Sequence, residues 1–258
     1  MRLSCSHANE LLYCCVPLFV RPLHDLTAAV DAQLVRAERP VRAALLIISG
    51  TVATWWAYVP LHELLHALAC WLTGGTVTEL QIAPEYGGAI FAQLLPFVVS
   101  GGTYAGRLSG FDTHGSDLIY LATDAMPFLL TILVGVPLLQ ACAGHRRPLL
   151  FGTAVVVALA PFYCLIGDYY EMGSILVTRA FASLQGAGEG VPFVILRSDD
   201  ALQTISTLWY RPETLQLHSA EALATAVAVI AASLVLGFLL ACATYALGAW
   251  WARLSVGR

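Results

Sequence analysis

The sequence predicts an all-α fold: a polytopic membrane helix bundle of about six apolar segments, with a short β-like membrane-associated strip after one helix. Two observations predict it. The 258-residue chain is 58% hydrophobic and only 12% charged, with a mean hydropathy of +0.73, which exceeds the apolar share of an ordinary soluble domain. Several apolar stretches also approach the roughly 20 residues that a helix needs to cross a bilayer. We therefore expect an integral, multi-pass protein embedded in the lipid bilayer of a bacterial plasma membrane.

The chain divides into four parts on this interpretation. They are an N-terminal interfacial segment (1–42), a membrane core (43–175), an extramembrane or interfacial connection (176–218) and a C-terminal transmembrane helix (219–258). The apolar segments expected within them are 43–58, 61–73, 89–104, 118–141, 149–167 and 220–250.

The N-terminal part is expected to lie at the membrane surface. Residues 11–20 are apolar, but Glu10 precedes them and Pro17 interrupts them, so we interpret them as interfacial rather than as a cleaved signal. Residues 23–39 alternate apolar and charged positions, which is typical of a helix on the membrane surface or in water.

The first crossing begins after Arg42 and ends near Tyr58, and Pro60 suits the first turn of a new helix. That second helix stops at Gly74–Gly75. At about 13 residues it is too short to span roughly 30 Å of hydrocarbon, so we expect it to lie inside the bundle.

Residues 76–91 differ in character, because apolar residues there alternate with polar ones, a proline and a glycine pair. We expect short extended segments with a turn. Non-helical backbone at membrane depth is tolerated only beside protein or a water-filled cavity. This strip is therefore a candidate wall of such a cavity, the alternative being an ordinary hairpin outside the membrane.

The second half of the chain has weaker boundaries. Asp124, Pro127 and Pro137 interrupt the crossing at 118–141. Ser198–Asp200 is expected to start a helix within the polar connection, and Ser219 to cap the last crossing.

Charge and cysteine content exclude two classes of function. The net charge of −4 comes with no basic run, so we expect no nucleic-acid partner. Seven cysteines without a C-x-x-C pair indicate neither a disulfide framework nor a cysteine metal site. The arginines form three groups, which the positive-inside rule places in the cytoplasm; they are Arg36, Arg39 and Arg42, then Arg146 and Arg147, then Arg253 and Arg258.

The most informative motif is H-E-x-x-H at residues 62–66, inside an apolar stretch. Residues four apart share a helix face, so His62 and His66 can hold one metal ion. Glu63 can then act as a general base toward a metal-activated water. Ionisable groups in hydrocarbon usually mark function, although His and Glu that merely hydrogen-bond between helices are the alternative.

A catalytic zinc site needs a third protein ligand. Asp168 is the first candidate, because it follows Gly167 at the end of an apolar crossing where the helix can bend. Glu171, three residues on, and Asp124 are alternative ligands. For each carboxylate the competing role is an interhelical hydrogen bond or a position near the headgroups.

These motifs resemble those of the site-2 proteases, the intramembrane zinc metalloproteases, over roughly residues 43–175. His62, Glu63 and His66 match the family's H-E-x-x-H, and Asp168 is similar in placement to its distal zinc-binding Asp. Residues 124–127 read D-A-M-P where family members often have N-x-x-P. Residues 82–88 resemble the Pro- and Gly-rich β element that follows the metal helix.

The resemblance implies a zinc-dependent endopeptidase that cleaves a transmembrane protein or peptide substrate. Zinc would be held by His62, His66 and Asp168, with Glu63 as the base. An exposed strand near residues 82–90 would bind the substrate by β-augmentation, through residues that include Ile82, Pro84, Gly87 and Gly88. The alternatives are a non-catalytic membrane metal-binding regulator and a transporter. The oligomeric state stays open.

Overall fold

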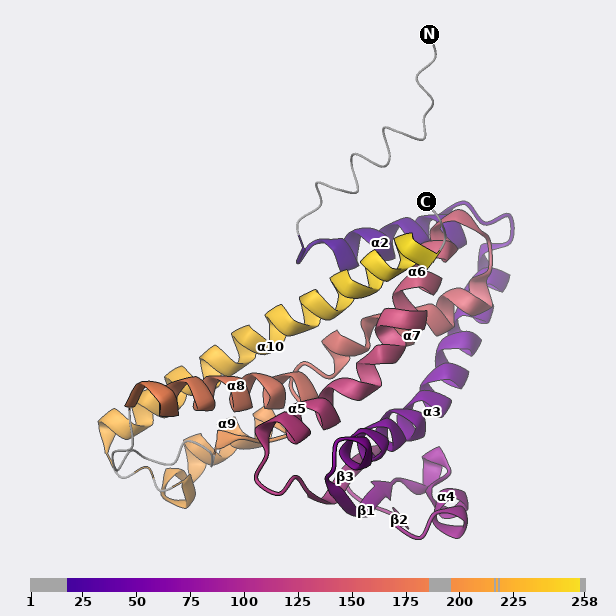
Figure 1. Cartoon of the computed structure of the whole chain (residues 1–258). Helices are drawn as coiled ribbons and strands as arrows, with labels where there is room; N and C mark the ends of the chain where they lie inside the picture. Colours follow the sequence, from indigo (N-terminus) through magenta and orange to yellow (C-terminus); the bar gives the residue numbers. More distant parts are fainter. Residues whose placement is uncertain (1–17, 186–195, 216, 218, 256–258) are drawn as a thin grey trace.

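A computed structural model describes residues 18–185, 196–215, 217 and 219–255. It is a bundle of long helices with a three-stranded sheet at one end of α3 (Figure 1). The helices are α2 (Arg21–Val30), α3 (Pro40–Leu72), α4 (Gly88–Leu94), α5 (Asp117–Ala125), α6 (Val136–Gly144), α7 (Pro148–Tyr163), α8 (Asp168–Gln185), α9 (Ala201–Tyr210) and α10 (Ala220–Ser255). The expected interfacial stretch at 11–20 lies mostly outside the described residues.

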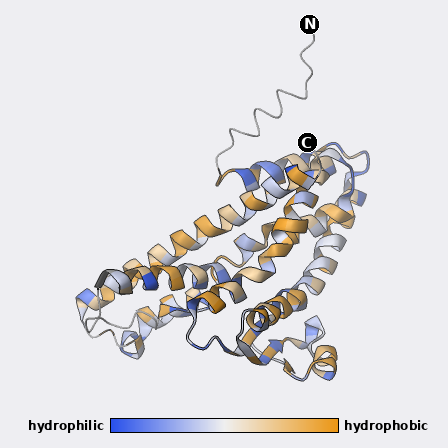
Figure 2. Ribbon diagram, viewed as in Figure 1, coloured by the Kyte–Doolittle hydropathy of each residue, from blue (hydrophilic) through white to orange (hydrophobic). Residues whose placement is uncertain are grey.

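Four helical stretches in the described part of the chain are long and apolar enough to cross a membrane. They are Pro40–Leu72, Asp117–Gly144, Pro148–Ser183 and Ala220–Ser255. Apolar residues cover much of these helices in Figure 2. The membrane-helix class predicted from composition is thus supported, whereas the count of six apolar segments is not.

Two of the six segments merge into one helix. Pro60 does not begin a new helix, because α3 runs unbroken through it for 33 residues. An internal proline removes one backbone hydrogen bond and crowds the preceding turn, but membrane helices tolerate it where neighbouring groups compensate. The H-E-x-x-H motif therefore lies within a long spanning helix rather than in a short buried one.

The segment expected at 89–104 is not a crossing either. Its residues form the seven-residue helix α4 and the short strand β2 (Val98–Ser100). Strand β1 (Thr76–Ile82) is central, with β2 parallel on one side and β3 (Gly106–Asp112) antiparallel on the other. The expected extended segment is confirmed at 76–82, but residues 88–91 are helical.

The two crossings that carry the motif and Asp168 pack at a very short distance. A Cβ atom on Gly50 of α3 would lie 2.2 Å from the carbonyl oxygen of Leu149, and one on Gly152 of α7 would lie 2.2 Å from that of Ile47. Small residues allow such backbone contact between membrane helices. Glycine therefore fixes the distance between α3 and α7.

Several local predictions are confirmed. The Asp200 side chain caps α9 by accepting from the Gln203 amide at 2.8 Å, and the Ser219 hydroxyl accepts from the Ala222 amide at 3.0 Å.

Helix α2 lies across the end of the bundle where α6 meets α7 and α10 terminates (Figure 1). The described arginines of all three groups therefore lie at one end of the bundle.

The glycine contact between α3 and α7 predicts a stability effect. Gly152→Ala would force its Cβ against backbone, so we expect a loss of about 1–3 kcal/mol in the free energy of unfolding, as for other overpacked sites. Thermal unfolding in detergent measures it. Gly144→Ala is the matched control, because a Cβ at Gly144 meets no atom within 4 Å. Equal melting temperatures for the two variants would contradict this packing.

Candidate metal centre

The two histidines of the motif lie on one face of α3 and point into the bundle. Each is only 6% exposed. Their Nε2 atoms are 3.1 Å apart. The i, i+4 spacing places them one above the other, and Phe128 packs edge-on against the His62 ring.

Asp168 joins them from a distant part of the sequence. Between α7 and α8 the helix is interrupted at residues 164–167, and Asp168 is the first residue of α8. Its Oδ2 lies 3.0 Å from His62 Nε2 and 3.7 Å from His66 Nε2. The ligand atoms of the three residues all lie within 4.8 Å of one another.

Hydrogen bonding fixes where the proton of His66 lies. Its Nδ1 is 2.8 Å from the carbonyl oxygen of Thr123. A carbonyl only accepts, so Nδ1 carries the hydrogen and Nε2 of the neutral ring presents a lone pair. Metal-binding histidines are commonly oriented in this way, by donating the other ring N–H to a carbonyl. His62 Nδ1 has a similar neighbour, the Tyr58 hydroxyl at 3.2 Å.

The three side chains therefore present converging acceptors. A single hydrogen on His62 Nε2 can satisfy only one of its two neighbours, whereas a metal ion satisfies all three. Ligands at about 2.0–2.1 Å around a tetrahedral ion are about 3.3 Å apart, and the observed separations of 3.0, 3.1 and 3.7 Å bracket that spacing. His62, His66 and Asp168 thus form a buried group that can hold a metal ion.

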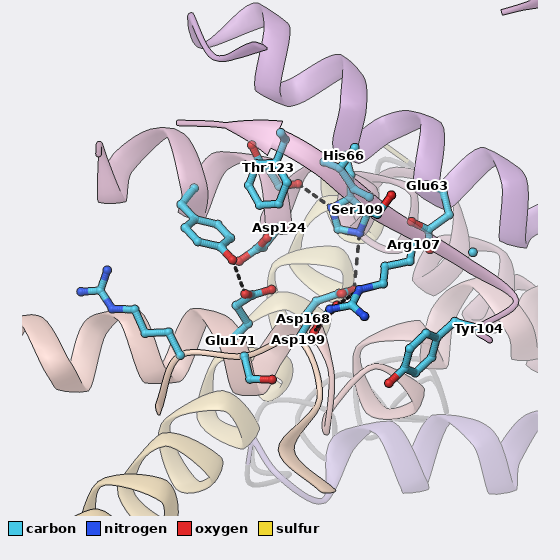
Figure 3. A pocket seen from close by; sticks show the side chains of 16 residues that line it. Glu63, His66, Tyr104, Arg107, Ser109, Thr123, Asp124, Asp168, Glu171 and Asp199 are labelled. Atoms are coloured by element: carbon cyan, nitrogen blue, oxygen red, sulfur yellow. Dashed lines mark hydrogen bonds and ion pairs between the residues drawn. The ribbon is translucent and has the colours of Figure 1, made fainter. Parts of the chain in front are cut away.

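The two alternative carboxylates lie beside this group rather than in it. Glu171 accepts a short hydrogen bond from the Tyr120 hydroxyl. Asp124, one residue after the carbonyl that orients His66, is 4% exposed. Both line a cavity of about 530 Å³ that also contains His66 and Asp168 (Figure 3).

Glu63 faces two cavities. It lines the 530 Å³ cavity and a second one of about 460 Å³, and Asp168 also lines both. The group formed by His62, His66 and Asp168 therefore has open space on the side where Glu63 lies.

Strand β3 contributes site residues that the sequence did not indicate. A Cβ on Gly106 would lie 2.4 Å from Glu63 Cγ, and Leu108, two residues further along β3, lines the same cavity as Glu63. Nothing in the local sequence marks these two residues, because only the return of the chain from the sheet brings them to α3.

Two polar contacts lie beside these cavities, between the β3 region and the segment before α9. Arg107 of β3 forms an ion pair with Asp199 at 2.6 Å, and Tyr104 donates to Asp200 at 2.7 Å. Burial raises the pKa of Asp199, and the adjacent Arg107 opposes that rise. These contacts attach the segment before α9 to the sheet.

The four residues expected to bind substrate lie elsewhere. Ile82 is fully buried at the end of β1, and Pro84 begins an exposed turn. Gly87 has φ 83°, and a Cβ on Gly88 would lie 2.0 Å from the Ile82 carbonyl. None of the four lines either cavity. In the described part of the chain β1 has a neighbour on each side, so the strand beside Glu63 that is paired on one edge only is β3.

Comparison of the chain with models of protein families, with curated proteins and with solved structures finds no match.

The geometry predicts one divalent ion per chain. His62→Ala, His66→Ala and Asp168→Ala should each reduce the bound metal severely, because each removes one of three converging ligands. Elemental analysis of protein purified without chelator measures the metal-to-protein ratio. Glu171→Ala is the matched control and should retain the ion. Full metal content in the His62, His66 double variant would contradict the site.

Proposed function

We propose that the protein is an intramembrane zinc metalloprotease, similar to the site-2 proteases, that hydrolyses a peptide bond in or near a transmembrane segment of its substrate. One observation carries the proposal. The two histidines of H-E-x-x-H and Asp168 converge beside a cavity, and they lie on helices long enough to span a membrane.

The donor set favours zinc. Two imidazoles and one carboxylate are the protein ligands of many catalytic zinc sites, which leave one position open. Bound there, zinc supplies Lewis-acid polarisation of the scissile carbonyl and lowers the pKa of a water molecule toward neutrality. The Thr123 carbonyl keeps His66 in the required tautomer.

Glu63 is the proposed general base and acid. It follows the first ligand on α3 and lines both cavities. Its carboxylate takes a proton from the attacking water and then returns it to the amine that leaves as the peptide C–N bond breaks. Gly106 contacts this side chain from the sheet side.

The substrate is proposed to bind as an extended strand. A transmembrane helix hides its peptide bonds in its own hydrogen bonds, so a segment must unwind before attack. Strand β3 offers a free edge next to Glu63, and an edge strand can hold extended peptide through main-chain hydrogen bonds. This edge replaces the one near residues 82–90 that the sequence suggested.

Glu63→Gln tests the base. The variant keeps the side chain's shape and removes its proton-accepting charge, so it should retain zinc yet cleave a model transmembrane substrate at least ~10²-fold more slowly. Cleavage is followed by gel or mass spectrometry, with metal content measured in parallel. Near-normal turnover by this variant would exclude Glu63 as the base, and no cleavage by the unmodified zinc-loaded protein would favour a non-catalytic metal binder.

Gly106→Ala tests the positioning of Glu63 by β3. The added methyl group would lie 2.4 Å from Glu63 Cγ, so the side chain must move. We expect kcat to fall with zinc content unchanged, since the ligands lie on helices. A normal kcat would show that Glu63 does not depend on this contact.

A further inference from the structure

One carboxylate in the larger cavity has an unsatisfied oxygen. Asp124 is 96% buried, and its Oδ2 has no hydrogen-bond partner among the described residues. The side chain lies among the cavity-lining groups beside Glu171 (Figure 3). A buried acceptor without a partner is destabilising, and more so when it is charged. A bound hydrogen-bond donor would satisfy this oxygen of Asp124.

The charges around the cavity indicate the charge of a ligand that would satisfy Asp124. Arg107 forms its ion pair with Asp199. Arg197 forms a two-point contact with Asp117, at 2.6 and 3.3 Å. Both cavity arginines are thus engaged by carboxylates other than Asp124.

The remaining acidic groups that line the cavity divide by role, and one of them, Glu63, is the proposed base. Asp168 lies with the two histidines, where a metal ion would balance it. Among the described residues, Asp124 and Glu171 have one side-chain donor between them, the Tyr120 hydroxyl on Glu171. Two carboxylates buried together are stabilised by a cation that contacts both.

We propose that Asp124 and Glu171 form a specificity subsite for a basic side chain, lysine or arginine, of the substrate polypeptide. The proposal rests on the proposed function for the identity of the ligand. Because the cavity that contains these carboxylates is also lined by Glu63, His66 and Asp168, a side chain bound there belongs to a residue close to the scissile bond. A cationic group gives both carboxylates charge-assisted hydrogen bonds.

The subsite would make cleavage selective for transmembrane substrates that contain a basic residue. A basic residue within an apolar helix is rare and costly. A cavity that neutralises it would distinguish a substrate with such a residue from the many uncharged transmembrane helices nearby. Removal of one partner of a buried charge pair weakens binding strongly, so substrates with and without the basic residue would bind with different affinities.

A binding experiment separates this subsite from catalysis. The zinc-loaded Glu63→Gln protein in detergent is titrated with a set of model transmembrane peptides that differ only in the position of one Lys, each paired with a Met version. We expect one or two adjacent positions at which Lys binds at least ~10-fold more tightly than Met. Asp124→Asn and Glu171→Gln, added separately to the same protein, should abolish that preference. Glu85→Gln, an exposed carboxylate on the 84–86 turn, is the control and should keep it.

Other outcomes would overturn the inference. These are equal binding of Lys and Met peptides at every position, or a Lys preference that persists in the Asp124→Asn, Glu171→Gln double variant. A second metal equivalent that this double variant loses would show that the carboxylates hold a metal ion instead. Lys-dependent binding without any cleavage by the unmodified protein would contradict the proteolytic function and leave the basic-residue subsite in place.

Discussion

The structure depends on the cost of placing ionisable side chains inside apolar helices. His62 and His66 are buried and Asp168 is mostly buried in a bundle whose surroundings provide few polar partners. Such groups are stable only where they satisfy one another or a bound cation. The spacing of their three ligand atoms fits one ion, and the Thr123 carbonyl orients His66 toward it.

Helix packing brings these groups together. Gly50 and Gly152 let the backbones of α3 and α7 touch, which brings the interruption at 164–167 near the motif and directs Asp168 toward the histidines. On the other side, Gly106 lets β3 approach Glu63. Glycine contacts on two sides of α3 thus position the metal ligands and the proposed base within the same cavity.

The carboxylates in and around the cavity fall into two classes, those paired with an arginine and those that are not. Arg107 and Arg197 are used in ion pairs with Asp199 and Asp117, which join the segment before α9 to the sheet and to α5. Asp124 and Glu171, which lie nearer His66 and Asp168, have no arginine partner among the described residues. Both arginines that line the cavity are thus already paired, whereas these two carboxylates line it without an arginine partner in the described part of the chain.

The sequence by itself determined the membrane class, the spacing of His62, Glu63 and His66, the cap residues of α9 and α10 and the strand at 76–82, because composition, helical periodicity and capping are local properties. Only the tertiary structure decided that Asp168, rather than Glu171 or Asp124, meets the histidines, since three carboxylates near helix breaks look alike until the helices pack. Tertiary contacts likewise joined 43–58 and 61–73 into one helix through Pro60, and they made β1 a central strand. The free edge beside Glu63 therefore belongs to β3, whose sequence carries no signal of that role.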